Sequence, residues 1–249
     1  MQKKKFLLIA SSLATNYGLN KADASYPDLL RLAGERFMVE QKNSLLISEA
    51  SELISKTQDL PKNLVLHFGT SVGWPRAFIE VANMKFGLLP NPYYFDLPAH
   101  ESKSQFGRSK SRAKIRFKRI IKNILLPFGL YKPFTSKAKT LSDIKDLLDQ
   151  VDRQFDRILW IQHAFLLDKK TNIEAAIYMD YYKLIIETLT DAKLTKLTLA
   201  IPGPDFFKPS NYSIDQVHLS PEGHRTIAST ISSWEQGATN DFSGNCLYY

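Results

Sequence analysis

Residues 215–224 read Asp-Gln-Val-His-Leu-Ser-Pro-Glu-Gly-His, which places an acid and a histidine three residues apart just before a helix start. Ser220 is a good N-cap, proline suits the first helical position, and a glutamate in the first turn favours the positive end of the helix dipole. We therefore expect Asp215 and His218 in the loop before a helix that runs to about residue 234. At this spacing the carboxylate holds one imidazole nitrogen and leaves the other facing a cleft, which supplies two members of a Ser-His-Asp triad.

Two other interpretations of this stretch stay open. The same residues suit an ordinary capped helix preceded by two solvated polar side chains. A metal site is the second alternative, because histidine and carboxylate side chains bind zinc. It would use Asp215, His218, Glu222 and His224. Gly223 and the helix start explain the second half of the stretch without a metal, so we predict neither a metal nor a cofactor, and we expect His224 to pack or cap.

The composition is that of a globular protein large enough for one sizeable core: 249 residues, 44% hydrophobic and 23% charged. The single cysteine, Cys246, excludes an intrachain disulfide framework and a cysteine-based metal cluster. Three lysines followed by the apolar run 6–10 imitate a secretory signal, but the run is shorter than the roughly 7–15 residues of a signal core. It is better explained as a buried strand. We therefore predict a cytoplasmic protein, with peripheral association with the inner membrane left open.

Strands and helices alternate along most of the chain. Short apolar runs predict strands over 5–10, 37–40, 63–68, 157–162 and 196–201, and the segments between and after them predict helices over 26–36, 48–56, 142–155, 173–189 and 221–234. This alternation indicates a flavodoxin-like, three-layer α/β/α fold with a five-stranded parallel sheet in the order 2-1-3-4-5. We expect one domain over 1–236 and a flexible tail over 237–249.

An irregular, proline-containing segment over 84–140 interrupts this alternation and is predicted to be a basic, partly helical insertion after strand three. The net charge is +8, and nine basic residues with no acid lie in 102–122, so the rest of the chain sums to −1. An apolar stripe at helical spacing runs through it: Phe117, Ile121, Ile124, Leu125 and Phe128.

Three interpretations of the basic segment stay open: a solvated face, an arm that meets an anionic membrane surface, or a site for an acidic glycan or a phosphate-linked sugar intermediate. Nucleic acid is disfavoured, because no recognition motif is present and only Phe106 and Phe117 interleave with the cations.

In a doubly wound sheet, ligands bind at the carboxyl ends of the strands, beside strand one. Ser11 and Ser12 follow strand one, and Asp215 and His218 follow strand five, so the topology brings them to the same edge. We predict Ser12 as the nucleophile, with Ser11 as the second candidate, His218 as the base and Asp215 as the residue that orients it.

Other polar residues near this edge are weaker candidates. Gln162 and His163 end strand four and could contact substrate, whereas His67, inside an apolar strand, is expected to be a core residue. Arg76 could bind an anionic group of the substrate or pair on the surface.

The residues at the two ends of the chain resemble the SGNH (GDSL-type) hydrolase superfamily. Residues 10–18, Ala-Ser-Ser-Leu-Ala-Thr-Asn-Tyr-Gly, are similar to its first block, Gly-Asp-Ser-Leu with a following Tyr-Gly, and put Ser12 at the nucleophile position. Residues 215–219 are similar to its last block, Asp-x-x-His-Leu. The resemblance covers about residues 5–82 and 142–234.

The middle blocks depart from the pattern. The family usually has a glycine after strand two and Gly-x-Asn-Asp after strand three, which help the nucleophile's own N–H to stabilise an oxyanion. This chain has no glycine after strand two, and it reads Gly-Thr-Ser-Val at 69–72. The resemblance therefore implies oxyanion donors from the N–H of Ser12, the N–H of Gly69 and the Ser71 hydroxyl. The run to Arg76 resembles a branch, reading Gly-x-x-Asp-x-x-Pro-Arg, that often lies in bacterial surface-polysaccharide biosynthesis clusters.

This resemblance implies a serine esterase or O-acyltransferase acting on an acyl ester, mainly O-acetyl, of a carbohydrate in surface-polysaccharide metabolism. The alternative is a catalytically weak or inactive protein of the same fold that binds a glycan or a membrane-linked polysaccharide intermediate. Loss of one oxyanion donor, which costs about 100–1000-fold in rate, favours the alternative. The presence of serine, aspartate and histidine favours the enzyme.

Overall fold

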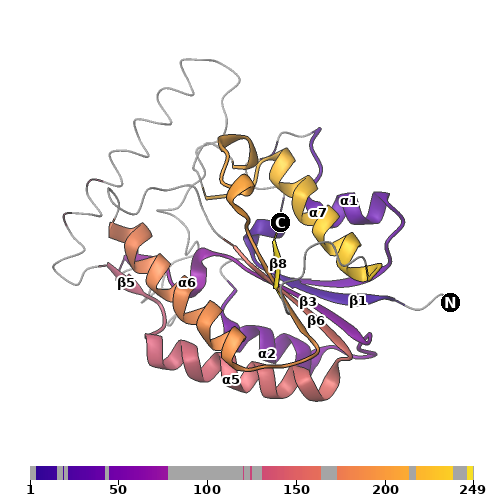
Figure 1. Ribbon diagram of the computed structural model, residues 1–249, viewed down its shortest axis with the longest axis horizontal. Helices are drawn as coiled ribbons and strands as arrows, with labels where there is room; N and C mark the ends of the chain where they lie inside the picture. Colours follow the sequence, from indigo (N-terminus) through magenta and orange to yellow (C-terminus); the bar gives the residue numbers. More distant parts are fainter. Residues whose placement is uncertain are drawn as a thin grey trace.

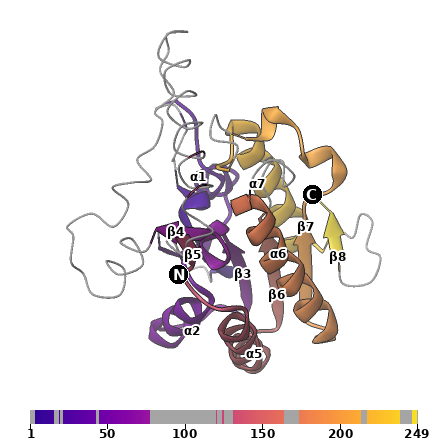
Figure 2. The same cartoon turned by 90° about the vertical axis from the view of Figure 1, so that its left-hand side faces the viewer.

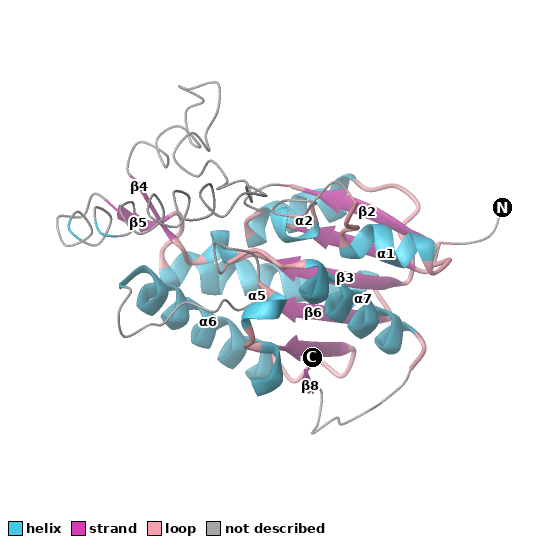
Figure 3. Ribbon diagram, turned by 90° about the horizontal axis from the view of Figure 1, so that it is seen from above, coloured by secondary structure: helices cyan, strands magenta, loops and turns pink. Residues whose placement is uncertain are grey.

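The structure is a computed structural model that describes residues 4–15, 19, 22–42, 45–77, 120, 124, 131–163, 173–212, 217–237 and 246–248. A six-stranded parallel sheet, in the order β2-β1-β3-β6-β7-β8, forms its centre (Figure 3). The strands are β1 (Phe6–Ala10), β2 (Phe37–Gln41), β3 (Asn63–Phe68), β6 (Arg157–Gln162), β7 (Leu197–Ile201) and β8 (Cys246–Tyr248).

The first five of these strands are the five predicted ones, and their order is the predicted 2-1-3-4-5. The sixth strand corrects the prediction of a flexible tail over 237–249. Residues 246–248 pair in parallel with β7 through Leu199, Ala200 and Ile201, and so form an edge of the sheet. No sequence pattern indicated this strand, because three residues are too few to show a strand periodicity.

Helices cover both faces of the sheet (Figures 1 and 2). On one face lie α1 (Tyr26–Leu32) and α7 (Pro221–Glu235); on the other lie α2 (Ile47–Lys56) and α5 (Lys137–Gln154). The long helix α6 (Ile173–Asp191) packs Tyr178 with the first group and Ile185 with the second. The predicted α/β/α fold is therefore confirmed. No helix in the described part of the chain has the length and apolarity to span a bilayer.

The strands alternate their side chains between two separate apolar clusters. Phe6, Leu8 and Ala10 of β1 face α1 and α7, whereas Leu7 and Ile9 face α2 and α5. All five residues are 0% exposed. This burial on both faces explains why the strand reads as a continuous apolar run rather than as an alternating pattern.

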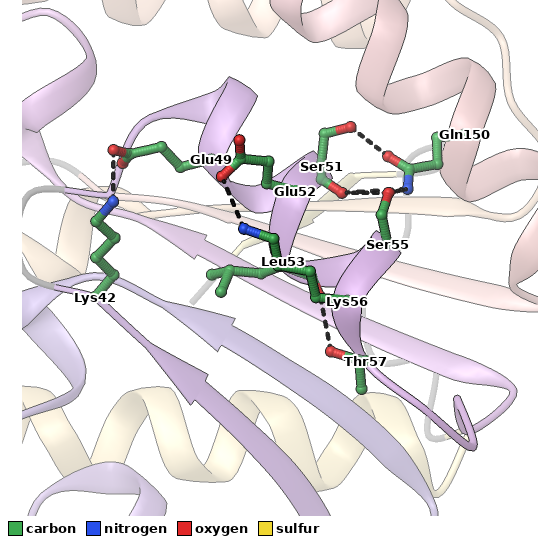
Figure 4. A network of polar contacts seen from close by, with 9 residues as sticks. All are labelled: Lys42, Glu49, Ser51, Glu52, Leu53, Ser55, Lys56, Thr57 and Gln150. Carbon is green, nitrogen blue, oxygen red and sulfur yellow. Dashed lines mark hydrogen bonds and ion pairs between the residues drawn. The ribbon is translucent and has the colours of Figure 1, made fainter.

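Polar contacts join α2 and α5 on the outer side of their layer (Figure 4). Gln150 of α5 accepts a hydrogen bond from the Ser51 hydroxyl of α2, and its Nε2 donates one to the Ser55 hydroxyl at 3.0 Å. Lys42 pairs with Glu49 at 2.7 Å. Surface contacts of this kind each contribute little to stability, so this layer is held mainly by its apolar interior.

A small antiparallel pair, β4 (Pro75–Ala77) with β5 (Tyr131–Pro133), lies beyond the carboxyl ends of the central strands (Figure 3). The sequence did not predict it. Helix α5 begins at Lys137, with Ser136 as its N-cap, so residues 131–140 belong to ordered elements rather than to the predicted insertion over 84–140. Within 84–130 only Ile120 and Ile124 are described; both are helical, with exposed fractions of 56% and 59%. The rest of the basic segment lies outside the described residues.

Candidate active site

Ser12 lies directly after β1, at the first position of a one-turn 3₁₀ helix over Ser12–Ala14. The preceding Ser11 is almost fully buried, and its N–H donates to the His67 carbonyl of β3 at 3.1 Å. The Ser11 hydroxyl caps the turn by accepting the Leu13 N–H at 3.4 Å. Ser12 is half-buried. Of the two candidate nucleophiles, the structure therefore uses Ser11 for local structure and leaves Ser12 the more exposed.

Gly69 follows β3 and lies against this turn. A Cβ atom at this position would stand 2.6 Å from the Ser11 hydroxyl oxygen, so only glycine fits beside the first turn without displacing it. Within the described part of the chain, the N–H groups of Ser12 and Gly69 make no hydrogen bond. Two backbone donors at the carboxyl edge of the sheet are thus uncommitted, as an oxyanion site requires.

Ser71, the third predicted oxyanion donor, is 5% exposed, and its hydroxyl donates to the Leu45 carbonyl at 2.8 Å. A serine hydroxyl has one proton. In this arrangement that proton is used to tie the loop after β3 to the loop before α2. A role of Ser71 in stabilising an oxyanion would require rotation away from Leu45.

His218 lies in the turn just before α7 and is half-buried. The helix starts as predicted: Ser220 accepts the Gly223 N–H at 3.2 Å, and Pro221 occupies the first turn. Gly223 is required because a Cβ there would stand 2.3 Å from the Asn211 carbonyl oxygen. Asp215, the predicted partner of His218, lies outside the described residues.

Contacts across the α1/α7 side of the sheet connect the serine turn to the histidine loop. His67, whose carbonyl holds Ser11, places Nδ1 3.0 Å from the Tyr26 hydroxyl. The Tyr26 N–H in turn donates to Nδ1 of His224 at 3.2 Å, and the two rings stack at 5.8 Å between centroids. His224 is close enough to His218 for the two rings to interact electrostatically. The turn that contains Ser12 and the helix start that follows His218 are thus linked through Ser11, His67, Tyr26 and His224.

Burial keeps the side chains of His67, His224 and Tyr26 neutral. It lowers the pKa of His67 well below 6.5, and His163 and His224 act in the same direction. Burial also lowers the pKa of His224 to about 4; His218 contributes to the shift and Asp28 opposes it. The pKa of the Tyr26 hydroxyl is raised by burial as well. These groups therefore support the site as neutral hydrogen-bonding residues.

Gln162 and His163 were predicted to contact substrate, but the exposed fractions of the two residues are only 1% and 0%. Gln162 accepts the Trp160 indole N–H at 3.2 Å. Nε2 of His163 lies 2.8 Å from the Val217 carbonyl oxygen. Their burial does not support direct contact with substrate. Both side chains bond to other parts of the protein instead.

Arg76 lies in β4, where it pairs in register with Lys132 of β5. Its side chain lies outside the described part, so its contact with an anionic group stays a prediction.

Sequence reasoning missed Tyr26, which it treated only as the start of a helix. Tyr26 contacts two histidines that are 41 and 198 residues away in the sequence. The sequence did contain one signal for this cluster of rings, namely that several histidines occur at strand ends or beside a helix start. Two of the five in the chain, His67 and His224, contact Tyr26; His163 packs against His67, and His218 interacts electrostatically with His224.

The same fold occurs in solved structures of hydrolases. Acetylxylan esterase Axe2 from Geobacillus stearothermophilus matches with a TM-score of 0.53 and 11% sequence identity, over 96% of this chain and 97% of the esterase. A putative acylhydrolase from Bacteroides fragilis matches with a TM-score of 0.52 and 10% identity, over 94% of this chain and 87% of the other. An alpha/beta hydrolase from the metagenome of Lake Arreo matches with a TM-score of 0.50 and 15% identity, over 96% and 97%.

No family model and no curated protein matches the chain. At these identities the likeness concerns the fold, which this chain shares with ester hydrolases over nearly its whole length.

Proposed function

We propose that this protein is a serine-dependent enzyme of the SGNH type that cleaves or transfers an acyl ester, with Ser12 as nucleophile and His218 as base. The observation that supports the proposal lies at the carboxyl edge of the sheet. Ser12 is half-buried there, and within the described residues its N–H and that of Gly69 make no hydrogen bond. The preceding Ser11 bonds to His67, which is linked through Tyr26 to His224 in the helix that follows His218. The fold shared with acetylxylan esterases supports it.

The reaction follows from these groups. The Ser12 hydroxyl oxygen attacks the ester carbonyl carbon while His218 takes the hydroxyl proton, and Asp215 orients the imidazole. The N–H groups of Ser12 and Gly69 stabilise the oxyanion. His218 then returns the proton to the alcohol as the carbon–oxygen bond of the ester breaks, which leaves an acyl-enzyme. Water or a second hydroxyl, deprotonated by His218, releases the acyl group, which makes the enzyme a hydrolase or a transferase.

Labelling with a fluorophosphonate, followed by peptide mapping, tests this proposal because only an activated serine reacts. We expect label on the peptide that contains Ser12 and none in Ser12→Ala. Ser11→Ala is the matched control one residue away, and it should still be labelled because the Ser11 hydroxyl only caps the turn. Absence of label in the folded wild-type protein, or label that persists in Ser12→Ala, would rule out Ser12 as nucleophile.

We further propose that the acyl group is an O-acetyl on a carbohydrate of a surface polysaccharide. The fold of the acetylxylan esterases and the Gly-x-x-x-x-x-Pro-Arg run ending at Arg76 support this choice. Release of acetate from acetylated polysaccharide, compared with transfer of labelled acetyl to a deacetylated one, distinguishes hydrolase from transferase.

One observation favours the alternative function, a catalytically weak protein that binds a glycan or a membrane-linked polysaccharide intermediate. The Ser71 hydroxyl is bonded to Leu45, so the site offers two backbone donors and no side-chain donor in place of the family's asparagine. Binding of acetylated glycan with a fluorophosphonate-inert Ser12 would identify this function.

For the basic segment over 102–122 we propose contact with an anionic membrane surface from the cytoplasmic side, with an acidic glycan as the competing partner. Its nine cations support this proposal, as do two exposed isoleucines, Ile120 within the segment and Ile124 just beyond it. Electrostatic attraction of exposed cations weakens as the Debye length falls from about 10 Å at 0.1 M salt to about 3 Å at 1 M. Cosedimentation with anionic vesicles should therefore occur at the lower salt only, and should be lost when Arg112, Lys114, Arg116, Lys118 and Arg119 are neutralised.

A further inference from the structure

His163 makes a long-range contact with the histidine loop. It follows β6 directly, it is 0% exposed, and its Nε2 lies 2.8 Å from the carbonyl oxygen of Val217, 54 residues further along the chain. A backbone carbonyl only accepts hydrogen bonds, so Nε2 carries the proton and His163 is the donor.

The His163 imidazole is itself held in place. The His163 carbonyl accepts the Tyr178 hydroxyl of α6 at 2.8 Å. Its ring packs against His67 of β3 at 6.0 Å and against Tyr212 at 6.4 Å between centroids. The donor that reaches Val217 is therefore anchored at the end of a central strand and contacted by residues from three other segments.

The acceptor is next to the proposed base. The Val217 carbonyl and the His218 N–H belong to one planar peptide unit, so holding the carbonyl oxygen also holds the plane that contains the His218 nitrogen and Cα, from which its side chain starts. Two further contacts of this loop lie after His218: Leu219 bridges to Tyr212, and the Ser220 N–H donates to the Asn211 carbonyl at 3.1 Å. His163 thus holds the peptide on the amino-terminal side of His218.

We infer that His163 is a positioning residue: by donating from Nε2 to the Val217 carbonyl, it sets the orientation of His218 toward Ser12. The consequence for catalysis rests on the function proposed above. A misplacement of about 1 Å in a reacting group lowers the rate by about 100-fold, so loss of this bond should reduce kcat and leave substrate binding nearly unchanged.

Two substitutions separate the donor from the volume of the side chain. Glutamine carries an amide nitrogen the same number of bonds from Cα as Nε2 of histidine, so His163→Gln should keep the bond. His163→Leu removes the donor and retains an apolar volume. If the leucine variant fails to fold, His163→Asn replaces it, because the asparagine amide is one bond too short to reach Val217.

The first measurement is hydrogen–deuterium exchange of the amides in 217–220. We expect exchange at least tenfold faster in His163→Leu than in the wild type, and near wild-type exchange in His163→Gln. The second is kcat and KM for a small acetyl ester: kcat should fall 10- to 100-fold in the leucine variant with KM within threefold, and most of kcat should return in the glutamine variant. Leu147→Ala, buried on the opposite face, controls for a general loss of stability.

Unchanged loop exchange in folded His163→Leu would overturn the inference, and so would a glutamine variant as perturbed as the leucine one. The exchange comparison does not depend on activity. If the wild-type protein neither turns over esters nor reacts with a fluorophosphonate, the proposed function fails, while the exchange data still decide whether His163 positions the loop.

Discussion

The two faces of the sheet are equally buried but chemically different. The face toward α2 and α5 is filled by hydrocarbon side chains and Trp160, whereas the face toward α1 and α7 also carries histidine and tyrosine rings bonded to one another. Within the described chain, every buried histidine lies on the α1/α7 side or at its edge: His67, His163 and His224.

The two faces of this sheet therefore have different roles: one serves stability alone, and the other also supports the proposed site. Burying polar rings costs free energy unless they are hydrogen-bonded, so such a face is retained where it supports a site. The apolar face supplies cohesion without that cost. Substitutions on the α2/α5 face should therefore change stability alone, and substitutions on the α1/α7 face should change activity as well.

The largest expected effect comes from the reacting groups themselves. Ser12→Ala and His218→Ala should each lower kcat for a small acetyl ester by about 10⁴-fold or more, because a triad acts as a unit. Thermal unfolding should change little, since both side chains are half-buried and neither serves the apolar core. Steady-state kinetics beside calorimetry checks this. A near-wild-type rate in either variant would contradict the proposal that the active site lies on the α1/α7 side.

The next effect tests the two faces with a matched pair. Leu147 of α5 and Ile227 of α7 are both 0% exposed, one in each apolar cluster. Truncation of either to alanine should reduce the free energy of unfolding by about 2–5 kcal/mol, as measured by chemical denaturation.

Activity per folded molecule should separate the pair. Leu147→Ala should keep kcat within about twofold. Ile227→Ala should lower it severalfold, because α7 carries His224 and begins beside His218. Equal kcat losses in the two variants would contradict the proposed division between the faces.

The third effect is a dependence of stability on pH that comes from the buried histidines of the α1/α7 side. Burial lowers the pKa of His224 from 6.5 to about 4. Between pH 4 and pH 6.5 this residue is therefore protonated in the unfolded chain and neutral in the folded one. The free energy of unfolding should therefore fall as the pH drops from about 6.5 to about 4, by about 3 kcal/mol for this residue, and level off below. His67, whose pKa is also lowered by burial, adds in the same direction.

His224→Asn is the control for this pH dependence. Asparagine does not titrate, and its side-chain oxygen lies the same number of bonds from Cα as Nδ1 of histidine, so it can still accept the Tyr26 N–H. Urea unfolding at pH 7 and pH 5 should show a smaller difference in the variant than in the wild type. An equal difference would mean that His224 titrates normally in the folded protein.

The sequence was sufficient for the strand order, because each central strand is a short apolar run bounded by polar turns. It was also sufficient for the helix start at Ser220, whose serine–proline signal is local. It failed for contacts that depend on distant segments. His163 was interpreted as a substrate contact because it ends a strand, but the Val217 carbonyl that holds it lies 54 residues away. The short pair β4–β5 and the edge strand β8 have too few residues for a pattern.

The smallest expected effect concerns Ser71, which connects the site to the α2/α5 side. Ser71→Ala leaves the buried Leu45 carbonyl without its donor, which should cost about 1–2 kcal/mol of stability. If the Ser71 hydroxyl serves only this bond, kcat for the acetyl ester should fall less than about tenfold. Chemical denaturation and steady-state kinetics measure the two quantities on the same sample.

A loss of about 100–1000-fold in kcat would instead identify the Ser71 hydroxyl as an oxyanion donor that rotates away from Leu45 during the reaction. Thr135→Val is the control, because the Thr135 hydroxyl lies 3.4 Å from the carbonyl oxygen of Val72, the residue after Ser71, and the substitution keeps the side-chain volume. Since both hydroxyls hold the turn after β3, equal small losses in kcat would assign both to structure. A large loss confined to Ser71→Ala would extend the catalytic site across the sheet edge toward α2.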